Sequence, residues 1–169
     1  EKDVVIENED VVYTFSTRGG NIKDVLLKKY LTYTKEPLHL VDEESSRITE
    51  VLYTRNGNYD INKFYFSSSS GNRSLKNKDT LNLDFMAEIK PGKFIRRTYR
   101  IPGNGYKILQ NTKFTGLDAD LTRNTIDYTW EANIRNSEKD LKTSQQKTTI
   151  KYYTLTGKIN DLKESSMDR

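Results

Sequence analysis

The chain has 169 residues, a net charge of +4, a sequence pI of about 9.1 and a mean hydropathy of -0.84. Its 11 Tyr, 6 Phe and 1 Trp argue against intrinsic disorder, and its length suits a single domain with its own core. The absence of cysteine excludes a disulfide framework, a thiol nucleophile and any cysteine-ligated metal site. No apolar run approaches the length that a membrane-spanning helix needs.

The first part of the chain predicts a β-hairpin. Short strands are expected at residues 4–6 and 11–15, and in the second of these apolar and polar residues alternate with the period of a strand. Gly19-Gly20 permits a tight reversal, because glycine adopts positive φ without steric cost. The return strand is expected to continue through residues 25–33.

A second hairpin is predicted between residues 81 and 101, where apolar residues occupy alternate positions before and after Pro91-Gly92. A two-residue loop would place Phe85 opposite Thr98. We favour a three-residue loop, Pro91-Gly92-Lys93, because it pairs apolar with apolar and acidic with basic side chains. Its cross-strand pairs are Ile89 with Ile95, Phe85 with Tyr99, Leu83 with Ile101, Glu88 with Arg96, and Asp84 with Arg100.

This register leaves Arg97 on the apolar face, opposite Ala87. A lone buried charge is costly unless it is paired. We favour an arginine that extends its charged head to solvent at the margin of the sheet. The alternative is a cationic group that lines a cleft on the inner face.

The rest of the pattern completes an all-β prediction, with many antiparallel strands in two packed sheets and at most one short helix. Further strands are expected at residues 38–41, 48–53, 64–66, 106–115, 125–134 and 150–153. Residues 67–72 have the composition of a flexible loop, and residues 163–169 are expected to fray. The helix is expected at residues 137–147, with Ser137 as its N-cap and Leu141 as its apolar anchor.

The sequence predicts no catalytic, cofactor-binding or metal-binding residue. His39 lies between two leucines in a predicted strand and is expected to be structural, and Glu43-Glu44 to be solvated surface. Residues 73–113 carry ten Lys/Arg against three Asp/Glu, a net of +7, which we interpret as solvated strand faces and not as a nucleic-acid site. The lysines without an obvious partner there are Lys76, Lys78, Lys93 and Lys107.

Several motifs together resemble the periplasmic domain of YidC-type membrane protein insertases. The first group is Ser16-Thr17-Arg18-Gly19-Gly20-Asn21-Ile22, then Leu26-Leu27-Lys28-Lys29-Tyr30, then Pro37-Leu38-His39-Leu40. The second group is Gly92, Arg97-Thr98-Tyr99-Arg100-Ile101 and Gly105-Tyr106-Lys107-Ile108. Their order and spacing cover about the first two thirds of the chain.

The resemblance implies a β-supersandwich of the galactose mutarotase type, with residues 1–169 as one periplasmic domain that lacks its final strand or linker helices. A membrane helix would precede Glu1 and the insertase core would follow Arg169. The domain would be a non-catalytic docking or chaperone-like module, tethered to the bacterial inner membrane. Its partners would be nascent membrane proteins and subunits of the Sec translocon. No site residue can be transferred, and the partner-binding surface is not predicted.

Two alternative functions stay open at this stage. A carbohydrate-binding or carbohydrate-modifying β-sandwich would need convergent polar and aromatic side chains in a concave cleft. A weak contact with anionic lipid would use the basic region at residues 73–113.

Overall fold

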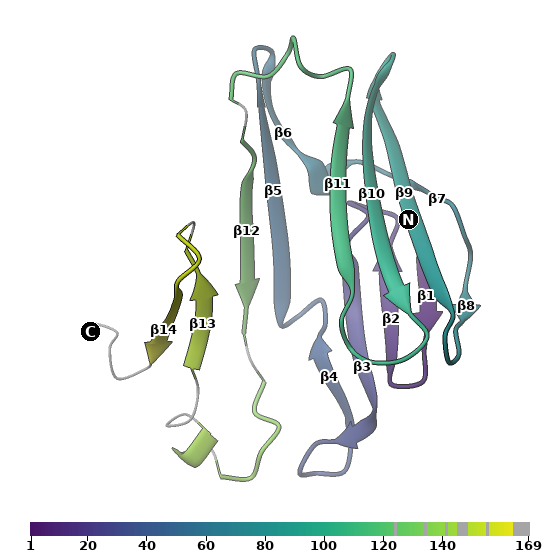
Figure 1. Ribbon diagram of the computed structural model, residues 1–169. Helices are drawn as coiled ribbons and strands as arrows, with labels where there is room; N and C mark the ends of the chain where they lie inside the picture. The colour runs from purple at the N-terminus through teal and green to yellow at the C-terminus, as the bar shows by residue number, and fades with distance from the viewer. Residues whose placement is uncertain (124, 134, 141, 145–148, 155, 164–169) are drawn as a thin grey trace.

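The computed structural model describes residues 1–169 except 124, 134, 141, 145–148, 155 and 164–169 (Figure 1). Within that part of the chain the strands form sheets of five, four, three and two strands. Neighbouring strands pair antiparallel except for the short parallel contact between β1 and β8. The predicted all-β class with packed antiparallel sheets is confirmed, whereas the specific galactose mutarotase-like architecture stays a prediction.

Two sheets pack face to face and hold the core. The first has the order β4-β3-β2-β1-β8 and the second the order β11-β10-β9-β7. The strands of the first are β1 (Asp3–Glu7), β2 (Val11–Ser16), β3 (Ile22–Leu31), β4 (Pro37–Val41) and β8 (Arg73–Ser74). Those of the second are β7 (Ser67–Ser68), β9 (Thr80–Lys90), β10 (Lys93–Pro102) and β11 (Leu109–Thr115). The ring of Phe15 on β2 lies 4.8 Å from that of Tyr99 and 5.8 Å from that of Phe85, which joins the two layers.

A third sheet, β12-β5-β6, stands beside this pair (Figure 1). Its strands are β5 (Ser46–Thr54), β6 (Gly57–Asp60) and β12 (Asp127–Ala132), and the 3-10 helix η1 (Ile61–Lys63) follows β6. The strands β13 (Thr149–Tyr153) and β14 (Ile159–Lys163) pair only with each other among the described residues. In Figure 1 this hairpin lies on the outer side of β12.

The diglycine turn is built as the sequence predicts, and β2 pairs with β3. Both glycines have positive φ, +75° at Gly19 and +63° at Gly20. A Cβ atom on Gly20 would lie 3.1 Å from the Cβ of Phe85, so the turn also needs glycine for close packing. The hydroxyl of Tyr99 donates a 2.9 Å hydrogen bond to the carbonyl oxygen of Gly20. The turn is thereby fixed against the opposite sheet.

The predicted register of the second hairpin is wrong by two residues. Lys90 pairs with Lys93 across a two-residue turn, and a bulge between Lys93 and Phe94 then leaves Ile89 without a cross-strand partner. Phe85 therefore lies opposite Arg97. A shift of two residues keeps every side chain on its predicted face, because the strand period is two.

The changed register also changes the ion pairs on the outer face. Arg96 pairs with Asp84 at 2.5 Å and not with Glu88. Glu88 instead accepts a 2.9 Å hydrogen bond from the backbone N–H of Gly92 in the turn. Asp84 lies opposite Thr98 and not opposite Arg100.

Several short elements differ from those that the sequence predicts. Residues 64–66 form no strand apart from one isolated bridge between Tyr65 and Arg18, while the predicted loop at 67–72 contains β7. Helical residues are described only at 142–144, and 137–140 are not helical; residues 141 and 145–147 of the predicted helix lie outside the described part. The expected frayed end begins inside β14, and residues 164–169 are outside the described part. No helix among the described residues is long and apolar enough to cross a membrane.

Candidate functional site

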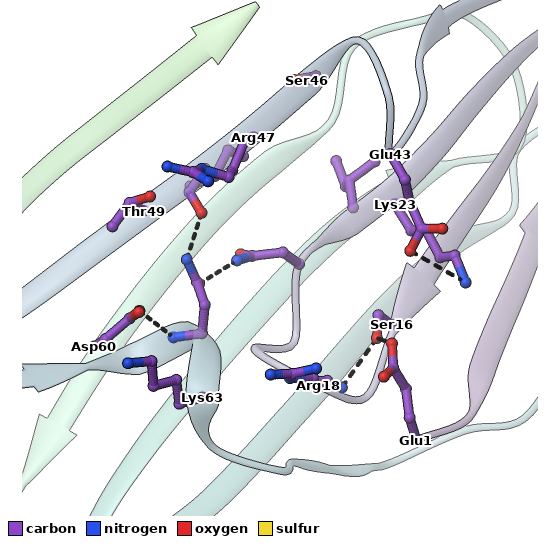
Figure 2. A pocket seen from close by; sticks show the side chains of 14 residues that line it. Glu1, Ser16, Arg18, Lys23, Glu43, Ser46, Arg47, Thr49, Asp60 and Lys63 are labelled. Carbon is purple, nitrogen blue, oxygen red and sulfur yellow. Dashed lines mark hydrogen bonds and ion pairs between the residues drawn. The ribbon is translucent and has the colours of Figure 1, made fainter.

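A cleft of about 490 Å³ opens where the first and third sheets approach each other (Figure 2). The β2–β3 turn, the start of β5 and the helix η1 supply most of its walls. Its charged lining residues are Glu1, Arg18, Lys23, Glu43, Arg47, Asp60 and Lys63. Ser16, Ser46, Thr49, Asn21 and Asn62 add hydroxyl and amide groups. The lining is therefore polar and carries both signs of charge.

A hydrogen-bonded pair of asparagines fixes one wall of the cleft. The side-chain N–H of Asn21 donates to the side-chain oxygen of Asn62 at 2.7 Å, and Asn62 donates to the carbonyl oxygen of Ile48 on β5. The carboxylate of Asp60 caps η1 by accepting from the backbone N–H of Asn62 at 3.1 Å. Figure 2 shows these bonds converging on the start of η1. Three elements far apart in sequence are thus held in one geometry.

A buried ion pair lies directly behind this wall. The guanidinium of Arg97 on β10 pairs with the carboxylate of Glu50 on β5 and donates to the side-chain oxygen of Asn21. Both charged side chains are enclosed, with relative exposures of 0% for Arg97 and 1% for Glu50. The preferred prediction of an Arg97 that reaches solvent is wrong, because a carboxylate partner on another sheet satisfies its charge in the interior.

Burial shifts the ionisation of the groups around this pair. It lowers the pKa of the Arg97 guanidinium, and it raises the pKa of the Tyr99 hydroxyl to about 12. The Nε of Arg97 has no hydrogen-bond partner among the described residues, and the ring of Phe66 lies 5.7 Å from its guanidinium carbon. An arginine stays charged at any ordinary pH, so Glu50 supplies the charge that compensates it.

The sequence contained a signal for this pair that pattern reasoning did not use. Glu50 occupies the same face of β5 as Ile48 and Leu52, because these positions differ by two. An acidic residue on an apolar face and Arg97 on another apolar face are each costly alone. Matching the two would have predicted the contact between the second and third sheets.

The cations of the cleft differ in how far they are neutralised. Lys23 lies 3.2 Å from Asp3 and 3.3 Å from Glu43, and these hydrogen bonds, chiefly the one to Asp3, raise its pKa. Arg47 reaches Glu131 at 3.4 Å. Within the described part of the chain, Arg18 and Lys63 form no ion pair. Glu1 and Asp60 form no ion pair there either, so the cleft offers unpaired charges of both signs beside amide and hydroxyl groups.

His39 lies outside the cleft and lines the second hollow described below. It is partly exposed on β4, and its Nδ1 lies 2.6 Å from a carboxylate oxygen of Asp24 on β3. Glu43 and Glu44 are exposed but not simply solvated, since they pair with Lys23 and Arg135. Among the residues described, no group of three His, Cys, Asp or Glu could hold a metal ion.

A second hollow of about 690 Å³ lies between the β3–β4 hairpin and residues 135–137. Tyr33, Leu38, Leu40 and His39 are among its lining residues. Arg135 also lines it and is held by Asp42 at 3.1 Å and Glu44 at 2.7 Å. The arginine of this hollow is therefore paired, unlike Arg18 and Lys63 in the cleft.

Comparison with known proteins assigns the family. The model of the YidC periplasmic domain matches residues 3–169. The chain belongs to the YidC periplasmic domain family. It is 30% identical over 164 residues to the membrane protein insertase YidC of Amoebophilus asiaticus. The aligned region covers 96% of this chain and 28% of that protein. It is 31% identical over 175 residues to that of Parabacteroides distasonis, covering 99% of the chain and 26% of the relative.

The chain is also 30% identical over 171 residues to the membrane protein insertase YidC of Cytophaga hutchinsonii. The aligned region covers 99% of this chain and 26% of that relative. The chain thus spans about a quarter of the length of these relatives. The YidC resemblance read from the sequence motifs is confirmed. The first of its motifs borders the cleft, because Ser16, Arg18, Asn21 and Ile22 all line it.

Proposed function

We propose that this chain is a non-catalytic docking domain of a YidC-type membrane protein insertase. It lies in the periplasm, tethered to the bacterial inner membrane in the intact protein. The family match and the names of the relatives support the insertase assignment. The observation that carries the docking role is the polar cleft, where Arg18 and Lys63, which form no ion pair among the described residues, lie beside amide and hydroxyl groups.

Such a lining suits an extended polypeptide better than a small apolar ligand. Peptide carbonyl groups accept hydrogen bonds from Arg18, Lys63 and the hydroxyl groups, while acidic side chains of the partner pair with Arg18 and Lys63. The asparagine pair and the buried ion pair behind it hold these donors in place before binding, which limits the entropy lost on association. The partners are nascent membrane proteins and subunits of the Sec translocon.

The carbohydrate alternative gains no support from this geometry. Sugar-binding clefts use aromatic faces together with a few convergent polar groups. The described residues that line the cleft include no aromatic side chain. His39 and Asp24 lie outside it, so they do not serve as an acid–base pair there.

Site-specific crosslinking in the full-length protein tests the docking role. A photoreactive amino acid replaces Thr49 in the cleft, and in a second variant it replaces Met86 on the outer face of β9. We expect crosslinks to nascent chains or translocon subunits from position 49 in inner-membrane vesicles, and none from position 86. The double variant Arg18→Glu/Lys63→Glu should lose them, whereas Lys113→Glu on β11 should keep them. Equal crosslinking from both positions would contradict a specific cleft.

A weak contact with anionic lipid is a second proposed role. Lys35, Lys76, Lys78 and Lys107 form no ion pair within the described residues, whereas Lys93, which the sequence left without a partner, pairs with Asp120. Lys107 follows Tyr106, whose ring lies 6.4 Å from that of Tyr30 in an exposed aromatic pair. Lysine and tyrosine together suit a headgroup layer. Co-sedimentation of the chain with anionic vesicles at low and physiological salt measures this lipid contact. Salt-resistant vesicle binding without protein crosslinks would favour a lipid-binding role over the docking role.

A further inference from the structure

Several connections meet at one end of the two sheets that hold the core, and we call this surface the tyrosine end. It consists of residues 7–10, 28–36, 75–79 and 100–109, which include the β1–β2, β3–β4 and β10–β11 connections at the lower end of Figure 1. The backbone N–H of Glu9 donates to the carbonyl oxygen of Gly103 at 3.1 Å, and Gly103 donates to that of Asp79 at 2.9 Å. Lys28 donates in the same way to Asp10 at 2.9 Å. The connections therefore form one built surface.

Large apolar side chains of the tyrosine end are exposed. Tyr30 and Tyr106 are 50% and 48% exposed, and their ring centroids lie 6.4 Å apart. Leu31 and Leu109 are also largely exposed. The hydroxyl of the buried Tyr13 donates a 3.1 Å hydrogen bond to the carbonyl oxygen of Tyr106. The exposed ring of Tyr106 is thus carried by a backbone that the core holds in place.

The charge of the tyrosine end is weakly positive. Its residues include seven Lys/Arg against five Asp/Glu, a net of +2. Lys76, Lys78 and Lys107 form no ion pair with any described residue, whereas the carboxylates of Glu9 and Asp79 accept hydrogen bonds from backbone N–H groups. Long lysine side chains can lie along apolar surface and keep the ammonium group in water.

This combination of side chains suits the headgroup layer of a membrane. Tyrosine is enriched there because its ring is apolar and its hydroxyl is polar, and lysine pairs with anionic headgroups. Tyr30 belongs to β3 of the first sheet, and Tyr106 belongs to the connection between two strands of the second sheet. The exposed apolar groups therefore extend across the end of both sheets. A broad surface such as a bilayer can contact all of them at once.

We propose that the tyrosine end rests in the headgroup layer of the inner membrane, with Tyr30, Leu31, Tyr106 and Leu109 at the interface. This inference rests on the proposed membrane tether, and it locates the proposed lipid contact on one end of the domain. The ligand is a phospholipid headgroup, and the net positive charge favours an anionic one. The inference is independent of what the cleft binds.

This contact sets the distance between the cleft and the membrane. The strand β3 runs from the cleft, which Ile22 lines, to the tyrosine end, where Tyr30 lies. Tyr30 is eight positions after Ile22 in the sequence. At the rise of an extended strand, these eight positions span about 26 Å. A nascent chain would therefore reach the cleft only after about eight extended residues have left the headgroup layer.

The lack of cysteine in the chain permits a direct test. Asn104→Cys at the tyrosine end and Met86→Cys on the outer face of β9 are made singly in the full-length protein, with any cysteine elsewhere replaced by serine. Each is labelled with nitrobenzoxadiazole and reconstituted into liposomes of phosphatidylethanolamine and phosphatidylglycerol. The measurement is quenching of the label by a phospholipid that carries a nitroxide on its headgroup.

Met86 provides the matched control for this measurement. It is 47% exposed, and it lies six positions along β9 from Thr80, which pairs with Pro102 at the tyrosine end. These six positions place it about 20 Å from that end. We expect the label at position 104 to be quenched at least about threefold more strongly than the label at position 86, because only the first lies at headgroup depth.

The double variant Tyr30→Ser/Tyr106→Ser should reduce the quenching at position 104 to the level at position 86. Tyr65→Ser removes a tyrosine that is 63% exposed elsewhere on the chain, and it should leave the quenching unchanged. Circular dichroism shows whether each variant is folded. The comparison of the two labels in the parent protein stays decisive if the double variant does not fold.

Equal quenching at positions 104 and 86 would overturn the proposal, and so would quenching at position 104 that persists in the folded double variant. No quenching in liposomes, together with crosslinks from position 104 to a translocon subunit in native membranes, would assign the tyrosine end to a protein partner and would also overturn it. Crosslinks from position 49 are read separately. Their absence, with strong quenching confined to position 104, would contradict the docking role of the cleft and still support the lipid contact.

Discussion

The core and the strands β12 and β13 differ in how their aromatic side chains are used. In the core, Phe15, Phe85 and Tyr99 are at most 1% exposed and meet one another across two sheets. In β12 and β13, Trp130 and Tyr153 are 60% and 75% exposed. The same residue types therefore pack in the core of one region and lie at the surface of the other. The difference shows that a segment can form a strand without burying its aromatic side chains. Mutations in each region can therefore measure how much the burial of side chains contributes to stability.

The largest expected difference between the regions concerns charge. Glu50→Ala should lower the free energy of unfolding by about 3–5 kcal/mol, because it leaves the Arg97 charge buried without a partner. Glu131→Ala on β12 should cost less than about 1 kcal/mol, since its pair with Arg47 is exposed. Urea unfolding of the chain measures both.

The double variant Glu50→Leu/Arg97→Met provides the control for this prediction. It removes both charges and keeps similar volumes, so it should recover most of the stability that Glu50→Ala loses. A double variant as unstable as the single one would show that the hydrogen bonds around the pair matter more than its charge balance.

The next comparison concerns apolar packing. Phe85→Ala should cost about 3–5 kcal/mol, because it opens a cavity between the two main sheets. Tyr152→Ala should change the stability of this chain by less than about 0.5 kcal/mol, as expected for an exposed position. A large cost in the present chain would mean that Tyr152 is already packed.

How far the sequence predicts this fold depends on the range of each interaction. Alternation correctly assigned the faces of β2, β9 and β10, because that signal is carried by residues two apart. The bulge at Lys93 depends on the geometry of one turn, and no side-chain pattern marks it. The partnership of Arg97 with Glu50 joins residues 47 positions apart, so it required the topology as well as the two anomalies.

The cleft was less accessible to sequence reasoning than the core. Its residues come from the N-terminus, the β2–β3 turn, the strands β2, β3, β5 and β6, the loop before β5 and a short helix, and they share no local pattern. The family resemblance did include Arg18 and Asn21, although it gave them no role. Short strands such as β7 and β8 were missed because two residues carry no periodicity.

A smaller effect is expected at the turn that links the two main sheets. Gly20→Ala should cost about 1–3 kcal/mol, because a non-glycine residue is strained at φ +63° and its Cβ would press on Phe85. Gly71→Ala is the matched control, with no atom within 4 Å of an added Cβ and an expected change below about 0.5 kcal/mol. Similar costs at both positions would show that the turn does not anchor the two sheets. Thermal unfolding of the two variants provides the comparison.

The smallest effect concerns an outer-face ion pair and its dependence on pH. Asp84 accepts hydrogen bonds from Arg96 and Thr98, and the bond from Arg96 is the main reason that the pKa of Asp84 is lowered. A carboxyl group with a lowered pKa stabilises the fold above its unfolded pKa of about 3.9, and this contribution is lost as pH falls through the folded pKa. Asp84→Asn should therefore cost about 1 kcal/mol or less at pH 7, and the difference from the parent chain should shrink below about pH 4. Urea midpoints at pH 7, 5, 4 and 3 test this, and a difference that stays constant down to pH 3 would contradict an ionic contribution and leave only the neutral hydrogen bonds of Asp84.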